Sequence, residues 1–410
     1  MRTVKQIKRG LCAVVTGIAI GVSPLSAIGA RPLLVGMGDS IGEGVQGADA
    51  AWQTQAYSYI SLVNWQMGGD LTQPYIVSNP LGIIGNTDGR SRLYPNDINT
   101  NVAVSGATTN SLLYDRAQAA SPGQISSETD LVMYPRQQTQ IEYVESVQPH
   151  IILCWIGNND VLSTALSFGN MNASQLTPLA DFERDYIALA DRLGALSTNH
   201  DSKVVFANIP DVTSIGFLVD RNTAESITGF AVPLPDGHYT SIVGAFLMQL
   251  TGNSNLINDP NFVLDDAEVA LIRARTQEFN TIIQREADRI GMPVVDANSK
   301  FNEFVANPPV ITGIPLRTTL LGGLFSLDGV HPSNIGHAFI ANEFIKTMNQ
   351  SFAMSIPEIS SDWLTWFTWF DPSIDKDGDG KATGRFGVGL LETLAFMIGA
   401  TGDANDFQPD

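Results

Sequence analysis

Short apolar runs recur along the chain, and each is separated from the next by a longer segment of mixed polarity. A parallel strand covered on both faces reads as such a run, because neither row of its side chains meets water. The runs that fit this description are PLLVGMG (32–38), NVAVSG (101–106), IILCWIG (151–157), KVVFANI (203–209) and MPVVDA (292–297). They predict a parallel sheet of roughly five buried strands.

Several segments between these runs have the periodicity of amphipathic helices. One helix is predicted to begin at Thr177-Pro178, as N-cap and first residue. Its apolar stripe consists of Leu179, Phe182, Tyr186, Leu189 and Leu193. Asp265 and Glu268 resemble a capping box at the start of a second helix, and GHAFIANEFIKTM, after His331-Pro332, predicts a third. Because strands alternate with helices, we expect an α/β fold, a three-layer α/β/α sandwich around the sheet.

Two long connections and a C-terminal extension interrupt this alternation. Residues 66–100 and 214–262 are insertions that either shape a binding site or decorate the surface of a main domain over residues 31–354. From 355 to 410 the composition changes, and half of the chain's six tryptophans fall within seven residues. These are Trp363, Trp366 and Trp369. We expect them on an apolar flap packed against the main domain rather than on a surface for lipid or polymer.

The first thirty residues have the features of a secretory signal peptide. Four cationic residues between positions 2 and 9 precede GLCAVVTGIAIGV, an apolar run too short to span a bilayer. Small residues follow, so cleavage is predicted after Ala27 or Ala30. The mature protein is therefore expected to be secreted, either extracellular or periplasmic. No later apolar run reaches the length of a transmembrane helix.

The net charge limits which partners the protein can bind, and the cysteine content limits how its fold can be stabilised. The formal charge of −19 becomes −23 when the four cations of residues 1–30 are removed. Such an acidic surface repels phosphate backbones, which excludes nucleic acid as a partner. Cleavage also removes Cys12 and leaves Cys154 without an internal disulfide partner. Because Cys154 lies within an apolar run, it is predicted to be a buried hydrophobic residue rather than a nucleophile.

The stretch LLVGMGDSIGEGV (33–45) is compatible with three kinds of chemistry. A dinucleotide-binding loop would need its third glycine at position 41, which is Ile41. The G-x-S-x-G elbow of α/β-hydrolases fits around Ser40, but there the serine follows several strands and an upstream oxyanion motif, whereas Ser40 follows the first predicted strand. A third kind of serine hydrolase remains, and it requires partners elsewhere in the chain.

Distant residues supply the partners that a serine nucleophile requires. These are a base, an acid that orients the base, and donors for the oxyanion. Asp328 precedes His331 by three residues, a spacing that lets the carboxylate reach one imidazole nitrogen while the other faces Ser40. Gly106 and Asn159 follow apolar runs, so they are predicted at the carboxyl ends of strands, where sites form in open parallel sheets.

Two further polar residues near these motifs are predicted to lie outside the chemistry. His337 fits the surface of the helix that follows Pro332. Ser105 adjoins Gly106 but lacks a base of its own, so we expect it to be structural.

The quoted segments resemble, in the same order, the sequence blocks of the SGNH or GDSL-type hydrolase family. GDSIGEG resembles the first block, with the nucleophile at Ser40, and SGATT carries the glycine of the second at Gly106. The third block, G-x-N-D, matches GNND and makes Asn159 the oxyanion-hole asparagine. The fifth block, D-x-x-H, matches Asp328 to His331. The resemblance extends from about residue 33 to 350, and ANIPDVTSIGFL and GGLFSLDGVHPS are similar to a secreted bacterial branch.

The resemblance implies a flavodoxin-like parallel sheet and an esterase or lipase mechanism. His331 would take the proton of Ser40 as the serine attacks an ester carbonyl, and Asp328 would stabilise the imidazolium. The backbone N–H groups of Ser40 and Gly106 and the amide of Asn159 would hold the oxyanion, before water releases the acyl group. This chemistry requires no metal or other cofactor.

The sequence leaves the substrate open. The apolar segments of 214–262 and of the C-terminal extension favour acyl esters of lipids or small hydrophobic alcohols, although a polymer-linked ester also fits. A carbohydrate O-acetyl esterase is the alternative with the same chemistry. A protein of another class, a calcium-dependent surface-binding protein with vestigial catalytic residues, is also compatible with the sequence.

The segment DKDGDG near the C-terminus resembles the beginning of an EF-hand loop. Asp375, Asp377 and Asp379 occupy positions 1, 3 and 5 of such a loop, and Gly380 occupies position 6. Phe386 stands at position 12, where an EF-hand carries a bidentate acid. The three aspartates therefore form either a structural calcium site or a solvated acidic turn.

Overall fold

The computed structural model describes most of the chain after the predicted signal peptide. The described residues are 31–77, 90–166, 176–371, 373, 374, 376, 381–382 and 388–389. The predicted signal peptide (1–30) and the three aspartates of the predicted calcium loop (Asp375, Asp377 and Asp379) lie outside them.

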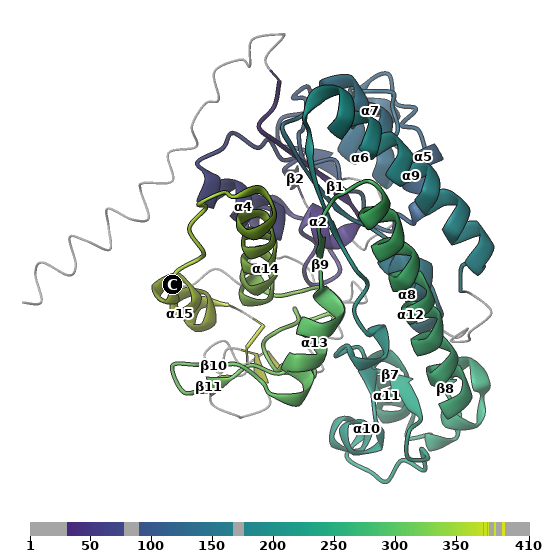
Figure 1. Ribbon diagram of the computed structural model, residues 1–410. Coiled ribbons are helices and arrows are strands. Elements are labelled where there is room, and N and C mark those ends of the chain that lie inside the picture. The colour runs from purple at the N-terminus through teal and green to yellow at the C-terminus, as the bar shows by residue number, and fades with distance from the viewer. Residues whose placement is uncertain are drawn as a thin grey trace, which may run out of the picture. The chain divides into compact units, whose positions relative to one another are not determined.

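A parallel sheet of four strands, in the order β1-β4-β5-β9, forms the centre of the fold (Figure 1). The strands are β1 (Leu34–Gly38), β4 (Ile151–Trp155), β5 (Lys203–Ala207) and β9 (Val294–Val295). Each derives from a predicted apolar run. The register places Leu34 beside Ile151 and Ile151 beside Lys203, so the carboxyl ends of β1, β4 and β5 share one edge.

The second predicted strand, 101–106, is a shorter extended segment beside β1. Asn101 forms a parallel bridge with Gly36, and the Val102 N–H donates to the Gly36 carbonyl at 2.8 Å. The Ala103 N–H bonds instead to the Asn101 side chain at 3.2 Å, which removes it from any ladder with another strand. With this segment the order is the flavodoxin-like 2-1-3-4-5, although the regular sheet has one strand fewer than predicted.

The two faces of the sheet separate into two hydrophobic clusters, because successive strand residues point to opposite sides. One cluster contains Val35, Met37, Ile152, Cys154, Val204 and Phe206. The other contains Leu34, Ile151, Leu153, Trp155, Val205 and Ala207. The near-continuous apolar runs therefore have the origin that the sequence predicted, which is burial on both faces.

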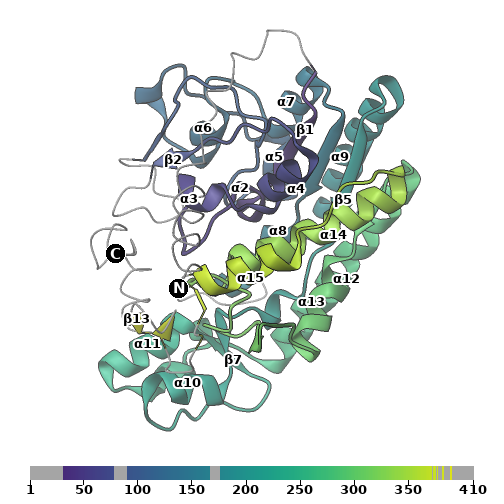
Figure 2. The same ribbon diagram turned by 90° about the vertical axis from the view of Figure 1, so that its left-hand side faces the viewer.

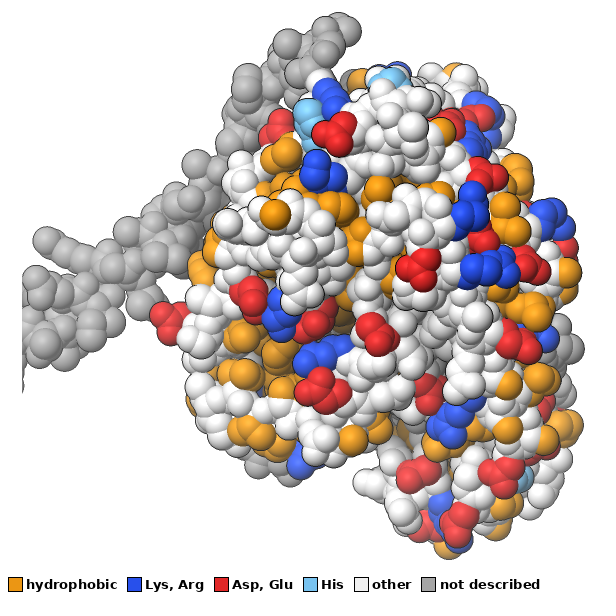
Figure 3. Space-filling model, viewed as in Figure 1, with side chains coloured by type: hydrophobic (Ala, Val, Ile, Leu, Met, Phe, Trp, Pro, Cys, Tyr) orange, Lys and Arg blue, Asp and Glu red, His pale blue; other side chains and the backbone are white. Residues whose placement is uncertain are grey.

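Helices cover both faces, which completes the predicted α/β/α sandwich (Figures 1 and 2). The first face carries α5 (Thr109–Tyr114), α7 (Gln140–Val147), α9 (Leu179–His200) and α12 (Asp266–Arg289). The second carries α4 (Tyr59–Met67) and α14 (Asn334–Phe352), and α15 (Ser361–Phe370) packs against α14. Ion pairs join α12 to α9, with Arg285 to Glu183 at 2.8 Å and Arg289 to Asp191 at 2.7 Å. In the space-filling view, basic and acidic side chains are interspersed along the right-hand side of the molecule (Figure 3).

The predicted starts of α9 and α12 agree with the structure to within about a residue, whereas α14 extends beyond the predicted segment 336–348 at both ends. The capping box of Asp265 and Glu268 is present at the start of α12. At the start of α9 the N-cap is Pro178 rather than Thr177. The reason is tertiary, because the Thr177 hydroxyl is used to donate to Asp160 at 2.9 Å.

The insertion 214–262 folds as a small subdomain next to the sandwich. It contributes β6 (Leu218–Val219), α10 (Arg221–Thr228), β7 (Tyr239–Ser241) and α11 (Ile242–Thr251), and with β8 (Val263–Leu264) its strands form an antiparallel sheet. Buried residues that include Val219, Leu234, Ile242 and Met248 give it a hydrophobic cluster of its own.

The remaining elements are short connections around the sandwich. They are α2 (Ser40–Glu43), α3 (Trp52–Gln55), β2 (Ile76–Val77), β3 (Ser91–Arg92), α6 (Glu128–Met133), α8 (Asn158–Leu166), α13 (Ala297–Ala306), β10 (Val310–Ile311), β11 (Ile314–Pro315), β12 (Lys381–Ala382) and β13 (Val388–Gly389), with 3-10 turns at Pro122–Gln124, Val212–Ser214, Ser254–Asn258 and Pro260–Phe262. None of the helices within the described ranges combines the length and hydrophobicity needed to cross a membrane.

The tryptophan-rich helix α15 is only partly sealed against the main domain. Phe367 is buried in the cluster beneath it. The three tryptophans, however, keep between 37% and 51% of their surface exposed, and Trp363 packs edge-on against Trp65 of α4. The helix thus resembles the predicted flap on one side and presents aromatic rings to solvent on the other.

Candidate active site

Ser40 lies at the carboxyl end of β1, where the strand turns directly into α2. Gly38 ends the strand with a φ of +148°, and a Cβ atom there would lie 2.2 Å from the carbonyl oxygen of Trp155. Asp39 then caps α2 by accepting a hydrogen bond from the Ile41 N–H at 3.0 Å. Glycine and cap together place Ser40 as the first residue of the helix, with 7% of its surface exposed.

His331 and Asp328 come from the loop that leads into α14 and meet Ser40 from the other side. His331 Nε2 lies 2.9 Å from Ser40 Oγ, and His331 Nδ1 lies 2.8 Å from Asp328 Oδ2. All three side chains are buried. The structure therefore brings together the three residues that the sequence assigned to nucleophile, base and acid.

Asp328 is held in place by backbone donors as well as by the imidazole. It accepts hydrogen bonds from the N–H groups of Val330 at 2.8 Å, His331 at 2.9 Å and Ala48 at 2.6 Å. Burial alone would raise the pKa of Asp328, but the charge of His331, the hydrogen bonds from its ring and backbone, and the bond from the Val330 N–H lower the pKa to about 2. The carboxylate is therefore ionised at neutral pH, and so it can orient the Nδ1–H of His331.

Of the predicted oxyanion donors, Asn159 lines the same pocket as Ser40, and Gly106 lies on a turn at the end of the second predicted strand. Gly106 occupies a turn with a φ of +76°, closed by a bond of 3.1 Å from the Ala107 N–H to the Val104 carbonyl. No hydrogen bond among the described residues uses the backbone N–H of Ser40 or of Gly106. Asn159 donates one amide hydrogen to the Ala107 carbonyl at 2.9 Å, which leaves its second hydrogen available.

Glu43 is a buried acid near the site to which the sequence analysis assigned no role. Its carboxylate accepts a hydrogen bond from the Ser105 N–H at 2.7 Å and another from the Ser105 hydroxyl. Burial and the nearby charge of Glu128 raise the pKa of Glu43 to about 7, against the opposing charge of Arg90. Ser105 is thus structural, as predicted, yet it does have a carboxylate partner. The available signal was an acid three residues after Ser40, within the same short segment of the sequence.

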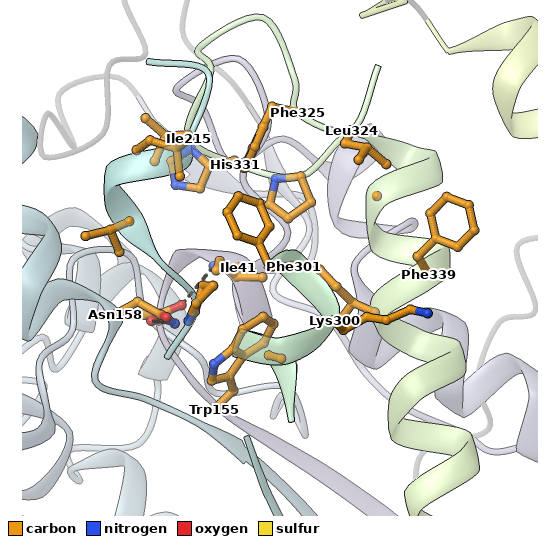
Figure 4. Close-up of a pocket in the computed structure, with 18 of the residues that line it drawn as sticks. Ile41, Trp155, Asn158, Ile215, Lys300, Phe301, Leu324, Phe325, His331 and Phe339 are labelled. Atoms are coloured by element: carbon orange, nitrogen blue, oxygen red, sulfur yellow. Dashed lines mark hydrogen bonds between the residues drawn. The ribbon is translucent and has the colours of Figure 1, made fainter. Parts of the chain in front are cut away.

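An apolar pocket with a volume of about 120 Å³ opens from Ser40 and His331. It extends between α13 and α14, and its aromatic and aliphatic walls include Ile215, Phe301, Phe304, Phe325, Phe339 and Ile340. In Figure 4, His331 and Ile215 lie at one side of this space and Phe339 and Lys300 at the other. Of the described part of the insertion 214–262, only Ile215 reaches the lining. The other apolar residues come from α13, α14 and the strand ends and loops around Ser40.

A family model for GDSL-like lipases and acylhydrolases matches residues 34–344. The chain belongs to this family. It is a carboxylic ester hydrolase, and the match spans the segments that carry Ser40, Gly106, Asn159, Asp328 and His331. This is the family that the order of the sequence blocks predicted.

Solved structures similar to this GDSL-family enzyme are distant in sequence. An alpha/beta hydrolase enzyme from the metagenome of Lake Arreo, Spain, shows 15% identity and a TM-score of 0.37 over 78% of this chain and 96% of the other. An acetylxylan esterase from Geobacillus stearothermophilus shows 17% identity and a TM-score of 0.38 over 78% and 95%. No curated protein matches the chain. The family assignment rests on the match over residues 34–344.

The sequence analysis predicted His337 of this GDSL-family enzyme on the surface of its helix. The side chain lies in the core instead. It is 0% exposed on α14, and neither ring nitrogen forms a hydrogen bond within the described part of the chain. Burial and the charge of His331 lower the pKa of His337 to about 3. The prediction was wrong because α14 is covered by α4 on one side and by α15 on the other.

The predicted calcium ligands Asp375, Asp377 and Asp379 lie outside the described residues. Within the described residues, no three His, Cys, Asp or Glu side chains are grouped so that they could hold an ion. Cys154 is fully buried in β4, and burial raises the pKa of its thiol. Its position agrees with the predicted role as a buried hydrophobic residue.

Proposed function

We propose that this enzyme hydrolyses acyl esters through a covalent intermediate on Ser40, with His331 as general base and Asp328 as the acid that orients it. The observation that carries the proposal is the pair of contacts at His331, 2.9 Å from Nε2 to Ser40 Oγ and 2.8 Å from Nδ1 to Asp328 Oδ2. These are the distances over which a proton passes between heavy atoms.

The reaction proceeds in two halves. As Ser40 Oγ bonds to the ester carbonyl carbon, its proton moves to His331 Nε2. Collapse of the tetrahedral intermediate breaks the bond to the alcohol oxygen, which leaves with that proton. Water then attacks the acyl-serine, gives a proton to His331, and the second collapse returns the proton to Ser40 Oγ and releases the carboxylic acid.

The oxyanion of both intermediates would be held by the N–H groups of Ser40 and Gly106 and by the free amide hydrogen of Asn159. Two features support this assignment: both backbone donors lack partners within the described residues, and Asn159 is fixed by its bond to Ala107. Donors oriented in advance stabilise the developing charge without reorganisation, and losing one typically costs around 10²–10³ in rate. The mechanism uses no metal or other cofactor.

We favour esters with an acyl chain longer than acetyl as substrates, because the apolar pocket begins at the nucleophile. Its lining on α14 runs from Gly336 to Glu343, a length of about 10 Å at 1.5 Å per residue. An acetyl group would leave most of this apolar space unfilled, and a carbohydrate would find few hydrogen-bond partners along it. The runner-up is an O-acetyl esterase that uses only the part of the pocket next to Ser40.

We further propose that the enzyme acts outside the cytoplasm. Support comes from the cationic start, the short apolar run and the small residues of positions 1–30, together with a single remaining cysteine. N-terminal sequencing of the protein recovered from the medium or periplasm should begin at residue 28 or 31, and an intact Met1 on exported protein would contradict the proposal.

The decisive experiment is labelling by a fluorophosphonate, which reacts only with an activated serine. The wild type and a Ser146→Ala control on α7 should label to one equivalent, and Ser40→Ala and His331→Ala should not. Absence of labelling in the wild type would instead favour the calcium-dependent binding protein. A series of p-nitrophenyl esters then separates the substrates, because a preference confined to acetate would favour the O-acetyl esterase.

A further inference from the structure

Glu43 connects the helix that carries Ser40 to the turn that carries Gly106. It is the last residue of α2, three positions after Ser40, and it is 0% exposed. One carboxylate oxygen, Oε2, accepts both hydrogen bonds from Ser105, while Oε1 forms none within the described residues. Ser105 is therefore held by its backbone and its side chain at the same time.

Holding Ser105 in this way also fixes Gly106, because the two residues are the central pair of one turn. The turn is closed by the bond from the Ala107 N–H to the Val104 carbonyl. Gly106 has a φ of +76° and its Cβ position is open, so no packing contact constrains it directly. The orientation of its N–H depends on how Ser105 is anchored.

The same turn is tied to the third donor. The Ala107 carbonyl accepts from Asn159 at 2.9 Å, and the neighbouring Asn158 donates to Asp39 at 2.8 Å. These contacts form a closed loop. Asp39 bonds to Asn158, the adjacent Asn159 bonds to the turn, the turn bonds to Glu43 through Ser105, and α2 connects Glu43 back to Asp39. Within it, Glu43 is the link between the two backbone donors.

We infer that Glu43 is a positioning residue for the oxyanion hole, which sets the Gly106 N–H relative to Ser40 without touching the substrate. The inference rests on the proposed function. A carboxylate suits the role because its ionised form, which prevails above its pKa of about 7, makes charge-assisted hydrogen bonds that are roughly twice as strong as neutral ones.

The buried charge of Glu43 lies close to other charged side chains. Arg90 pairs with Glu128 at 2.5 Å and approaches Asp49 at 3.8 Å. Glu128 and Arg90 both act on the Glu43 carboxylate, with opposite signs. An acid with no part in fixing the turn would be an expensive group to bury here, because an apolar side chain of similar size avoids the desolvation.

The test compares Glu43→Ala, Glu43→Gln and Ser105→Ala with a matched control, Glu286→Gln. Glu286 is also buried, at 3% exposed, but it pairs with Arg285 and Arg289 on α12. For each protein, kcat and KM are measured with p-nitrophenyl butyrate. The end point of fluorophosphonate labelling counts the folded sites, so that a loss of protein is separated from a loss of rate.

Glu43→Ala should label to the full end point and keep its KM within about threefold, while kcat falls by around 10²-fold, as for loss of one oxyanion donor. Glu43→Gln, which retains a neutral acceptor, should lose less. Ser105→Ala should also lower kcat. In the double variant Ser105→Ala/Glu43→Gln, the fold-decrease in kcat should be smaller than the product of the two single decreases, because both substitutions disrupt the same contact. Glu286→Gln should match the wild type.

Two results would overturn the inference. One is an unchanged kcat in Glu43→Ala, and the other is a kcat that falls only in proportion to the labelling end point, which indicates a structural role. If Glu43→Ala does not fold, Glu43→Gln and Ser105→Ala decide by the same criteria. An active Ser40→Ala enzyme would refute the proposed function itself. If Ser40→Ala is inactive but Glu43→Ala is fully active, only the inference is refuted.

Discussion

The side-chain amide of Asn158 donates to the carboxylate of Asp39 at 2.8 Å, in the buried space behind the site. Asp39 directly precedes Ser40, and Asn158 directly precedes Asn159. One hydrogen bond therefore sets the nucleophile-bearing end of β1 against the donor-bearing end of β4. Burial raises the pKa of Asp39 to about 6, even though this bond, the one from Ile41 and the charge of His331 oppose the rise.

Asp39→Asn should stabilise the protein at neutral pH. Between about pH 4 and 6 the folded state keeps a proton on Asp39 that the unfolded state has lost, so the free energy of unfolding falls as the pH rises through this window. Because an asparagine side chain cannot ionise, the Asp39→Asn variant does not lose this free energy of unfolding. The gain in the free energy of unfolding should be near zero at pH 4 and reach on the order of 3 kcal/mol above pH 6, measured by urea unfolding across that range. Asp265→Asn, at the exposed N-cap of α12, should show no such pH-dependent gain.

His337→Leu should make the protein more resistant to acid. The pKa of His337 is about 3 in the folded state, against an ordinary value of 6.5, so the unfolded state alone binds a proton between these values. The free energy of unfolding of the wild type therefore falls as the pH drops below about 6.5. The variant should gain on the order of 2 kcal/mol at pH 5. The exposed His150 provides the control, and an equal gain from His150→Leu would contradict the explanation.

Gly38→Ala should damage both stability and catalysis. The new Cβ would approach the Trp155 carbonyl within 2.2 Å at a φ of +148°, a combination of strain and collision that costs on the order of 3 kcal/mol. Relieving the collision displaces Ser40, so kcat should fall in the protein that remains folded. Thermal unfolding and kcat measure the two effects. Gly123→Ala, where a Cβ meets nothing within 4 Å, should leave both unchanged.

Ile340→Trp should shift the enzyme towards shorter acyl chains. The larger side chain fills the pocket between α13 and α14, and each methylene that is excluded is worth about 1–3 kcal/mol. The kcat/KM for p-nitrophenyl octanoate should fall by at least about tenfold, while that for acetate should stay within about threefold. Leu250→Trp, at a position that is 70% exposed on α11, is the matched control. Equal losses for both esters in Ile340→Trp would place the acyl chain elsewhere.

Local patterns were sufficient for four of the five predicted strands and, to within a few residues, for the three predicted helices. The apolar runs became β1, β4, β5 and β9, and the capping box at Asp265 begins α12 as predicted. The spacing of Asp328 and His331 likewise led to a contact within a single loop. These features depend on chain neighbours a few residues apart, which is the range over which backbone geometry and hydrophobic periodicity act.

Contacts between distant segments were decided only by tertiary packing. Glu43 and Ser105 are 62 positions apart, and their hydrogen bonds exist because α2 and the turn at Gly106 lie at the same edge of the sheet. The local sequence around His337 is compatible with a surface position, and the residue is buried only because α4 and α15 pack against α14. The pocket likewise arises where α13 and α14 face each other, and neither helix encodes it alone. The sequence thus determined which groups could perform the chemistry, and the packing of helices on the sheet decided what surrounds them, because burial and long-range hydrogen bonds belong to no single segment.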